Sequence, residues 1–155
     1  MKKIESFTVN HLKLKRGLYV SRRDEHNGTC VTTFDMRVTV PNVEPVMSTG
    51  ALHTIEHLGA TYLRNSEQAD KVVYFGPMGC RTGFYLVMFG HLNSVDVYDL
   101  VTQTYQFILQ FTGDIPGATP VECGNYSDQD LPAAKLYVRR YLDDLTQFKR
   151  FEYEV

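Results

Sequence analysis

Two histidines one helical turn apart form the clearest chemical pattern in the chain. They belong to the H-x-x-E-H sequence His53, Thr54, Ile55, Glu56 and His57. Residues four apart lie on the same face of a helix, so both imidazoles can reach one metal ion. Glu56, three residues after His53, flanks the same face of the helix and is positioned to move protons beside the metal. This pattern favours a catalytic metal site over a purely structural one.

A catalytic site of this kind uses three protein ligands and keeps one position open. The chain offers Cys123, Glu122, His91 and Cys80 as the third ligand. Cys123 would give a His2Cys site, whereas Glu122 would give the ligand set of H-x-x-E-H metallopeptidases. Spacing alone does not separate these two neighbours. A zinc metallopeptidase therefore remains an alternative, as does a structural metal-binding module closed by four ligands.

The chain has three cysteines, and an odd number without an export signal favours thiols for packing, metal binding or catalysis. Cys80 lies within residues 76–83, which hold three glycines and a proline. Such a segment brings the backbone close to another group and holds the thiol at a bend. Cys30 lies on the apolar side of an expected strand, where we expect a buried packing thiol.

Alternating apolar and polar residues predict the strands. We expect strands at residues 18–21 and 30–40, joined by a turn with the hairpin signal Asn27-Gly28. Residues 71–75 and 82–90 form two further expected strands that look heavily buried. In residues 30–40, Phe34 shares one face with the other apolar side chains, and Arg37 shares the polar face.

Apolar residues at helical spacing predict three helices. The first begins at a Ser48 or Thr49 cap and runs to about Asn65, the second begins at a Ser94 cap, and the third opens at Asp130. In the third helix we expect these side chains to face inward: Leu136, Tyr137, Tyr141, Leu145 and Phe148. Residues 112–131 are expected to form a loop, and the tail from Lys149 is expected to fray. Together these elements predict one α+β domain over residues 1–155, with helices packed on one face of a mostly antiparallel sheet.

The composition excludes some classes of partner. A formal charge of −2 and an isoelectric point near 6.2 argue against nucleic acid or an anionic membrane as the main partner. No run of about 18 apolar residues is present, and the N-terminal residues lack the apolar core of a signal peptide. We therefore expect a cytoplasmic protein.

Several separate motifs in order resemble the LuxS family, the S-ribosylhomocysteine lyases. They are Glu5-Ser6-Phe7 with His11, Phe34-Asp35-Met36-Arg37, Leu52 to Leu58, Arg64-Asn65, Gly76 to Tyr85, and Cys123-Gly124-Asn125. The resemblance implies a lyase that cleaves S-ribosylhomocysteine to homocysteine and 4,5-dihydroxy-2,3-pentanedione, the autoinducer-2 precursor. This reaction links methyl-cycle detoxification to quorum sensing.

The resemblance also implies a homodimer with two identical sites at the subunit interface. The metal would be held by His53, His57 and Cys123, with Cys80 and Glu56 as the acid–base pair. The substrate-binding residues would be Ser6, His11 and Arg37 at the ribosyl part and Arg64 near the homocysteine part. The family is associated with Fe(II), and a His2Cys set also suits Zn(II) or Co(II).

The chain departs from the family pattern in the segment before Cys80. Tyr74 stands where relatives usually carry an aspartate that is thought to hold the ammonium of the substrate, and Gly76 stands where they carry a serine. Asn10 also stands where an aspartate is common. The proposed metal and acid–base residues are all present, so the departures bear on how the substrate is recognised, above all its homocysteine part.

Overall fold

Four strands form one antiparallel sheet in the order β1-β2-β4-β3, in a computed structural model that describes residues 1–154. The strands are β1 (Gly17–His26), β2 (Thr29–Arg37), β3 (Val72–Pro77) and β4 (Gly83–Phe89). The predicted hairpin is confirmed: Asn27 and Gly28 join β1 to β2 with φ angles of 49° and 79°.

The strand ends differ from the sequence prediction. β1 continues to His26, because its polar residues still pair with β2 beyond an irregularity between Val20 and Arg22. β2 ends at Arg37 and not at Val40, because the amides of Val38 and Thr39 both donate to the carbonyl of Thr82, each at 3.0 Å. Cys30 is only half-buried, since it lies beside the hairpin turn. Its prediction as a buried packing thiol is wrong.

Three helices complete the fold: α1 (Thr49–Arg64), α2 (Ser94–Gln110) and α3 (Leu131–Phe148). Two single 3-10 turns, η1 (Glu5–Phe7) and η2 (Ala69–Lys71), precede β1 and β3. The predicted caps of α1 and α3 are confirmed, because Ser48 Oγ accepts from the Ala51 amide and Asp130 Oδ1 accepts from the Ala133 amide. Asn93 caps α2 in place of Ser94, in a reciprocal capping box with Asp96.

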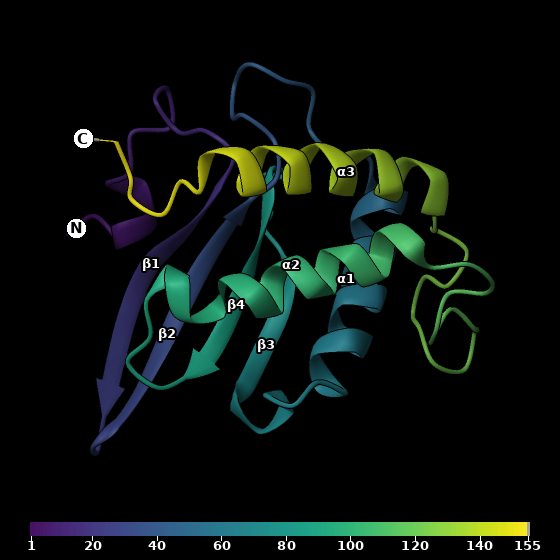
Figure 1. Ribbon diagram of the computed structural model, residues 1–155, viewed down its shortest axis with the longest axis horizontal. Helices are drawn as coiled ribbons and strands as arrows, with labels where there is room; N and C mark the ends of the chain where they lie inside the picture. The colour runs from purple at the N-terminus through teal and green to yellow at the C-terminus, as the bar shows by residue number, and fades with distance from the viewer. Residues whose placement is uncertain (155) are drawn as a thin grey trace.

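The core lies between one face of the sheet and the helices, as Figure 1 shows. Its largest side chains come mainly from β2, β4 and the three α-helices and include Phe34, Phe84, Met88, Ile55, Leu58, Tyr105 and Tyr141. This arrangement confirms the predicted α+β class. None of the helices in residues 1–154 combines the length and the apolar character needed to cross a membrane.

The buried stripe of α3 differs from the prediction. Leu136 and Phe148 are 60% and 52% exposed, so their assignment to the core is wrong. The residues buried on α3 are Ala134, Val138, Tyr141, Leu142 and Leu145. These five residues share one helical stripe, and Leu136 lies on the side away from it.

The C-terminal tail packs against the molecule. The amide of Leu18 donates to the carbonyl of Arg150 at 3.0 Å, and the ring of Tyr153 stacks on Tyr19 with centroids 4.6 Å apart. The expectation that the tail frays is therefore wrong. The two ends of the described chain lie at the same side of the molecule (Figure 1).

Candidate active site

A metal-binding group forms where α1 faces the loop between α2 and α3. One ligand atom each from His53, His57 and Cys123 lies within 4.8 Å of the others. His53 Nε2 is 3.4 Å from Cys123 Sγ, and the two imidazole rings lie 4.5 Å apart at an angle of 84°. All three side chains are half-buried. We call these three residues the metal group, because together they could hold a metal ion.

Backbone carbonyls orient both imidazoles of the metal group. His53 Nδ1 is 2.9 Å from the carbonyl oxygen of Asp128, and His57 Nδ1 is 2.7 Å from that of Pro116. A carbonyl only accepts a hydrogen bond, so each Nδ1 carries the proton and each Nε2 keeps a free lone pair. Two oriented imidazoles and a thiol are a donor set that fits a divalent first-row metal.

The structure distinguishes the candidates for the third ligand. Glu122 is exposed, and its carboxylate accepts from Thr119 Oγ1 at 2.7 Å. Within residues 1–154, the metal group contains Cys123 and none of the other three candidates, Glu122, His91 and Cys80. Three ligands also differ from the closed set of four that a structural site would use. Glu56 is half-buried on the same helix, three residues after His53.

Cys80 lies in the turn between β3 and β4. Hydrogen bonds from Met78 to Gly83 and from Arg81 to Met78, both 2.9 Å, close the turn, and Arg81 has a left-handed φ of 60°. The Cys80 sulfur lies 3.1 Å from Thr82 Oγ1 and 3.8 Å from Arg37 Nη1. Partial burial would raise the pKa of the thiol, but hydrogen bonds from Thr82 and the charge of Arg37 outweigh it, so the net pKa is lowered. These contacts therefore favour the thiolate form of Cys80 over the neutral thiol.

Asp35 fixes Arg37 beside this thiol. Arg37 Nε donates to Asp35 Oδ1 at 3.0 Å and Arg37 Nη2 to Asp35 Oδ2 at 2.6 Å, a bidentate pair in which both side chains are 3% exposed. Burial would lower the pKa of Arg37, but the charge of Asp35 and its hydrogen bonds raise it overall. The guanidinium therefore stays charged next to Cys80.

Four of the predicted residues line one cavity of about 400 Å³, namely Ser6, His11, Arg37 and Cys80. We call this cavity the thiol pocket. Asp35, Tyr85 and Tyr153 also line it. Asp35 could have been found from the sequence, because it shares the polar face of its strand with Arg37. No pattern in the sequence indicated Tyr153.

Arg64 lies outside the thiol pocket. Its guanidinium donates to the carbonyls of Val72 and Val73 at 2.5 and 2.9 Å. These bonds tie the end of α1 to the start of β3. A role for Arg64 near the homocysteine part of a substrate stays a prediction.

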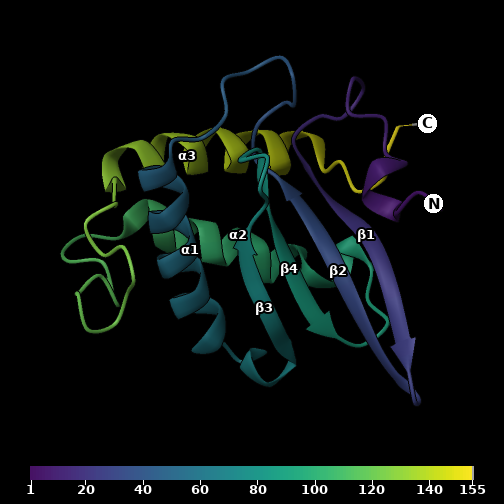
Figure 2. The ribbon, with the colours of Figure 1, turned by 180° about the vertical axis from the view of Figure 1, so that it is seen from behind.

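The metal group and the thiol pocket lie in different parts of the folded molecule. The described residues that line the pocket include none of the three metal ligands and not Glu56. The loop that carries Cys123 and the N-terminal arm that carries Ser6 and His11 lie at opposite ends of the molecule, as both views of the ribbon show (Figures 1 and 2).

Comparison with known proteins gives a family match and close relatives. The family model of S-ribosylhomocysteinase (LuxS) matches residues 4–152. The S-ribosylhomocysteine lyase of Clostridium beijerinckii is 55% identical over 146 residues, covering 94% of this chain and 92% of that protein. The same-named protein of Finegoldia magna is 53% identical over 150 residues, covering 97% and 96%. That of Phocaeicola vulgatus is 54% identical over 148 residues, covering 95% and 92%.

Proposed function

The chain belongs to the S-ribosylhomocysteinase (LuxS) family, and on this premise we propose that it cleaves S-ribosylhomocysteine to homocysteine and 4,5-dihydroxy-2,3-pentanedione. It is a carbon–sulfur lyase whose second product is the precursor of autoinducer-2. The observation that carries the proposal is the convergence of His53, His57 and Cys123, in a chain matched to the family over nearly its whole length.

The chemistry explains why a base and a charge-stabilising group are both needed. In the open-chain sugar, the thioether carbon is too far from the aldehyde for direct expulsion of sulfur. Moving the carbonyl along the sugar, through enediolates, brings the sulfur into the β position. Each move transfers a proton between carbons and builds negative charge on oxygen. The final elimination breaks the carbon–sulfur bond, and the sulfur leaves with its electron pair and is protonated to the thiol.

Residues of this chain suit the proton-transfer roles. We assign the Cys80 thiolate as one base, since Thr82 and Arg37 stabilise its negative charge. Glu56 is the second proton carrier, and Ser6 and His11 bind the ribosyl part with Arg37 as a fixed cation. A divalent metal held by His53, His57 and Cys123 would act as a Lewis acid toward charge on the sugar.

We propose Fe(II) as the metal in the cell, with one ion per subunit. The mixed imidazole and thiolate ligands also suit Zn(II) and Co(II), so an aerobic preparation can carry zinc. Arg64 is proposed to lie near the homocysteine part of the substrate, although its guanidinium already bonds to two carbonyls.

A homodimer with two sites at the interface would unite the separated halves of the site. We propose that each site combines the metal group and Glu56 of one subunit with the thiol pocket of the other. The sheet face away from the core is a candidate contact surface between subunits. Tyr74 and Phe89 lie on it, 51% and 47% exposed, because they alternate along their strands with the buried Phe75 and Met88. Figure 2 views the molecule from this side. We further propose that residues 1–155 form one catalytic domain, that the protein is cytoplasmic, and that its product is used in quorum sensing.

A thiol-release assay tests the function directly. Protein prepared without oxygen is analysed for bound metal and incubated with S-ribosylhomocysteine, and free thiol is detected with a chromogenic disulfide. We expect metal at about one ion per subunit and thiol release that depends on it. A metal-loaded wild-type protein that releases no thiol would contradict the proposed function.

A further inference from the structure

We propose that Tyr153 is a positioning residue for the reaction: from the C-terminal tail its hydroxyl holds Asp35, which in turn holds Arg37 beside Cys80. This inference rests on the proposed function, in which Cys80 is a base. Tyr153 lies just beyond residues 4–152, the part that the family model matches. The Tyr153 hydroxyl therefore reaches the thiol pocket from a residue outside the matched part of the chain.

Consecutive hydrogen bonds connect the tail to the thiol. Tyr153 Oη donates to Asp35 Oδ2 at 2.9 Å, and Asp35 holds Arg37 through two bonds. The remaining terminal nitrogen of Arg37, Nη1, donates to Thr82 Oγ1 at 2.6 Å and faces the Cys80 sulfur at 3.8 Å. Because Thr82 Oγ1 accepts from Arg37, its own proton is free to point at the Cys80 sulfur 3.1 Å away. Each bond fixes the direction of the next.

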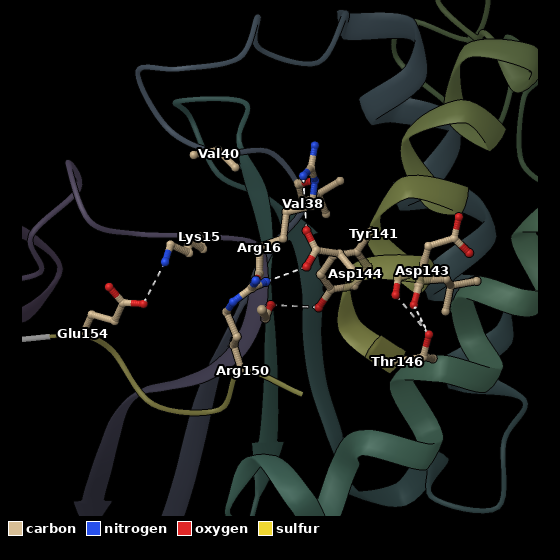
Figure 3. Close-up of polar contacts among 12 residues, drawn as sticks. Lys15, Arg16, Val38, Val40, Tyr141, Asp143, Asp144, Thr146, Arg150 and Glu154 are labelled. Carbon is tan, nitrogen blue, oxygen red and sulfur yellow. Dashed lines mark hydrogen bonds and ion pairs between the residues drawn. The ribbon is translucent and has the colours of Figure 1, made fainter. Parts of the chain in front are cut away.

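The tail is held in place on both sides of Tyr153. Arg150 forms an ion pair with Asp144 and donates to the carbonyl of Arg16 at 3.3 Å. Glu154 pairs with Lys15 at 3.1 Å. Figure 3 shows these contacts, in which the tail lies beside the segment that leads into β1. The ring of Tyr153 is stacked on Tyr19, nearly parallel at 18°. These contacts therefore hold the Tyr153 hydroxyl in position next to the Asp35 carboxylate.

The Tyr153 hydroxyl acts as the donor in this contact. Burial, followed by the charge of Asp35 and their hydrogen bond, raises the pKa of Tyr153 well above its ordinary value. The phenol stays protonated throughout the range in which the enzyme can work, so it donates to the carboxylate. Asp35 is 2% exposed, and water would not readily replace the lost donor. Removing the hydroxyl leaves more uncompensated negative charge near Cys80, which disfavours the thiolate.

Other charged or titratable groups also face Cys80, and the test must keep them constant. They are Arg37 and Asp35 from β2, Tyr85 from β4 and His11 from the N-terminal arm. Arg81, in the same turn, directs its guanidinium to the carbonyl of Met47 instead. Burial and then the charge of Asp35 raise the pKa of Tyr85, so this phenol is neutral. Replacing Tyr153 with Phe removes one oxygen, keeps the ring stacked on Tyr19 and leaves these groups unchanged.

The test measures the titration of Cys80 in the metal-loaded protein. The rate of alkylation by iodoacetamide is followed against pH, with Cys80→Ala subtracted to remove reaction at Cys30 and Cys123. In Tyr153→Phe we expect the apparent pKa of Cys80 to rise by about half a unit, which slows alkylation about threefold below that pKa. The acidic limb of kcat/KM should move by the same amount, and the rates should converge with wild type at higher pH.

Tyr19→Phe is the matched control, because it removes a hydroxyl from the same stacked pair. Tyr19 is the cross-strand partner of Asp35, but its hydroxyl donates to the carbonyl of Lys15 at 3.0 Å and not to the Asp35 carboxylate that Tyr153 holds. We expect its alkylation profile to match wild type. A Tyr153→Phe profile that superimposes on wild type would overturn the positioning role, and so would an equal shift in both variants, since it would reflect a loosened tail.

Alkylation needs no substrate, so the two hypotheses fail separately. A wild-type protein that releases no thiol from S-ribosylhomocysteine refutes the lyase function, whatever the alkylation profiles show. Normal thiol release with no shift in Tyr153→Phe refutes the positioning role alone.

Discussion

At the scale of single residues, Cys123 and its neighbour Glu122 differ in what surrounds them. The Cys123 sulfur faces His53, whereas Glu122 is exposed and bonded to Thr119. We predict that Cys123→Ser lowers metal affinity by at least about 100-fold, since a neutral hydroxyl replaces a thiolate ligand. Glu122→Gln should retain its metal and serves as the control. The check is metal content per subunit after dialysis against a chelator, and full retention in Cys123→Ser would contradict the His2Cys assignment.

Cys80 and Glu56 are proposed to move protons without binding the metal. We predict that Cys80→Ala and Glu56→Gln each lower the rate of thiol release by about 10²–10⁴-fold, the usual contribution of a positioned acid or base. Both variants should keep one metal ion per subunit, because neither side chain belongs to the metal group. Thiol release and metal analysis on the same samples check this. Loss of metal from either variant would show that its role is misassigned.

The sequence indicated candidate site residues more readily than the contacts that these residues make. The pair His53 and His57 is readable because both lie on one helix at fixed spacing. The sequence could not show whether Cys123 or Glu122 is the third ligand, because that depends on how a loop with no regular structure folds back onto α1. The contact of Tyr153 with Asp35 joins residues 118 positions apart and left no local pattern.

At the scale of elements, periodicity predicted the three α-helices and the four strands of residues 1–154, but neither the two 3-10 turns nor every boundary. Local signals such as the Ser48 cap and the Asn27-Gly28 turn were decisive, because their hydrogen bonds are made within a few residues. β2 ends where the amides of Val38 and Thr39 turn to the carbonyl of Thr82. The tail is held in place by the bond from the Leu18 amide to the carbonyl of Arg150. Such contacts between distant segments override local propensity.

The packing of α1 on β3 gives a test at this scale. A Cβ at Gly59 would lie 2.4 Å from Phe75 Cε1, and the Phe75 ring is itself stacked on Phe84 at 5.2 Å. We predict that Gly59→Ala lowers the free energy of unfolding by about 1–2 kcal/mol, because overpacking outweighs the better helix propensity of alanine. Urea unfolding with saturating metal measures the change.

Gly79→Ala is the control for this prediction. A Cβ at Gly79 has no neighbour within 4 Å, so we expect the free energy of unfolding to change by less than about 1 kcal/mol. If Gly59→Ala were as stable as wild type, Phe75 would have room to move, and the contact between α1 and β3 would be looser than these distances indicate.

At the scale of the whole molecule, the arrangement of the two clusters follows from the fold. The metal group requires α1 and the loop before α3, whereas the thiol pocket requires the N-terminal arm, β2 and the turn after β3. No local pattern in the sequence could indicate that the metal group and the thiol pocket are separated in space within one subunit. The family resemblance implies a dimer, and the separation of the two clusters is the structural observation that supports this proposal.

Mixed dimers distinguish a shared site from a site within one subunit. Glu56→Gln disables the metal half, Cys80→Ala disables the thiol half, and each variant alone is predicted to be inactive. If each site uses one half from each subunit, a mixed dimer has one site with both defects and one intact site.

Random mixing makes about half of the dimers mixed, so thiol release should recover to about a quarter of the wild-type rate. Different affinity tags on the two variants allow the mixed dimer to be purified after co-expression, and it should then reach about half of that rate. If the halves belonged to the same subunit, every site in the mixed dimer would carry one defect, and the rate would stay at that of the single variants.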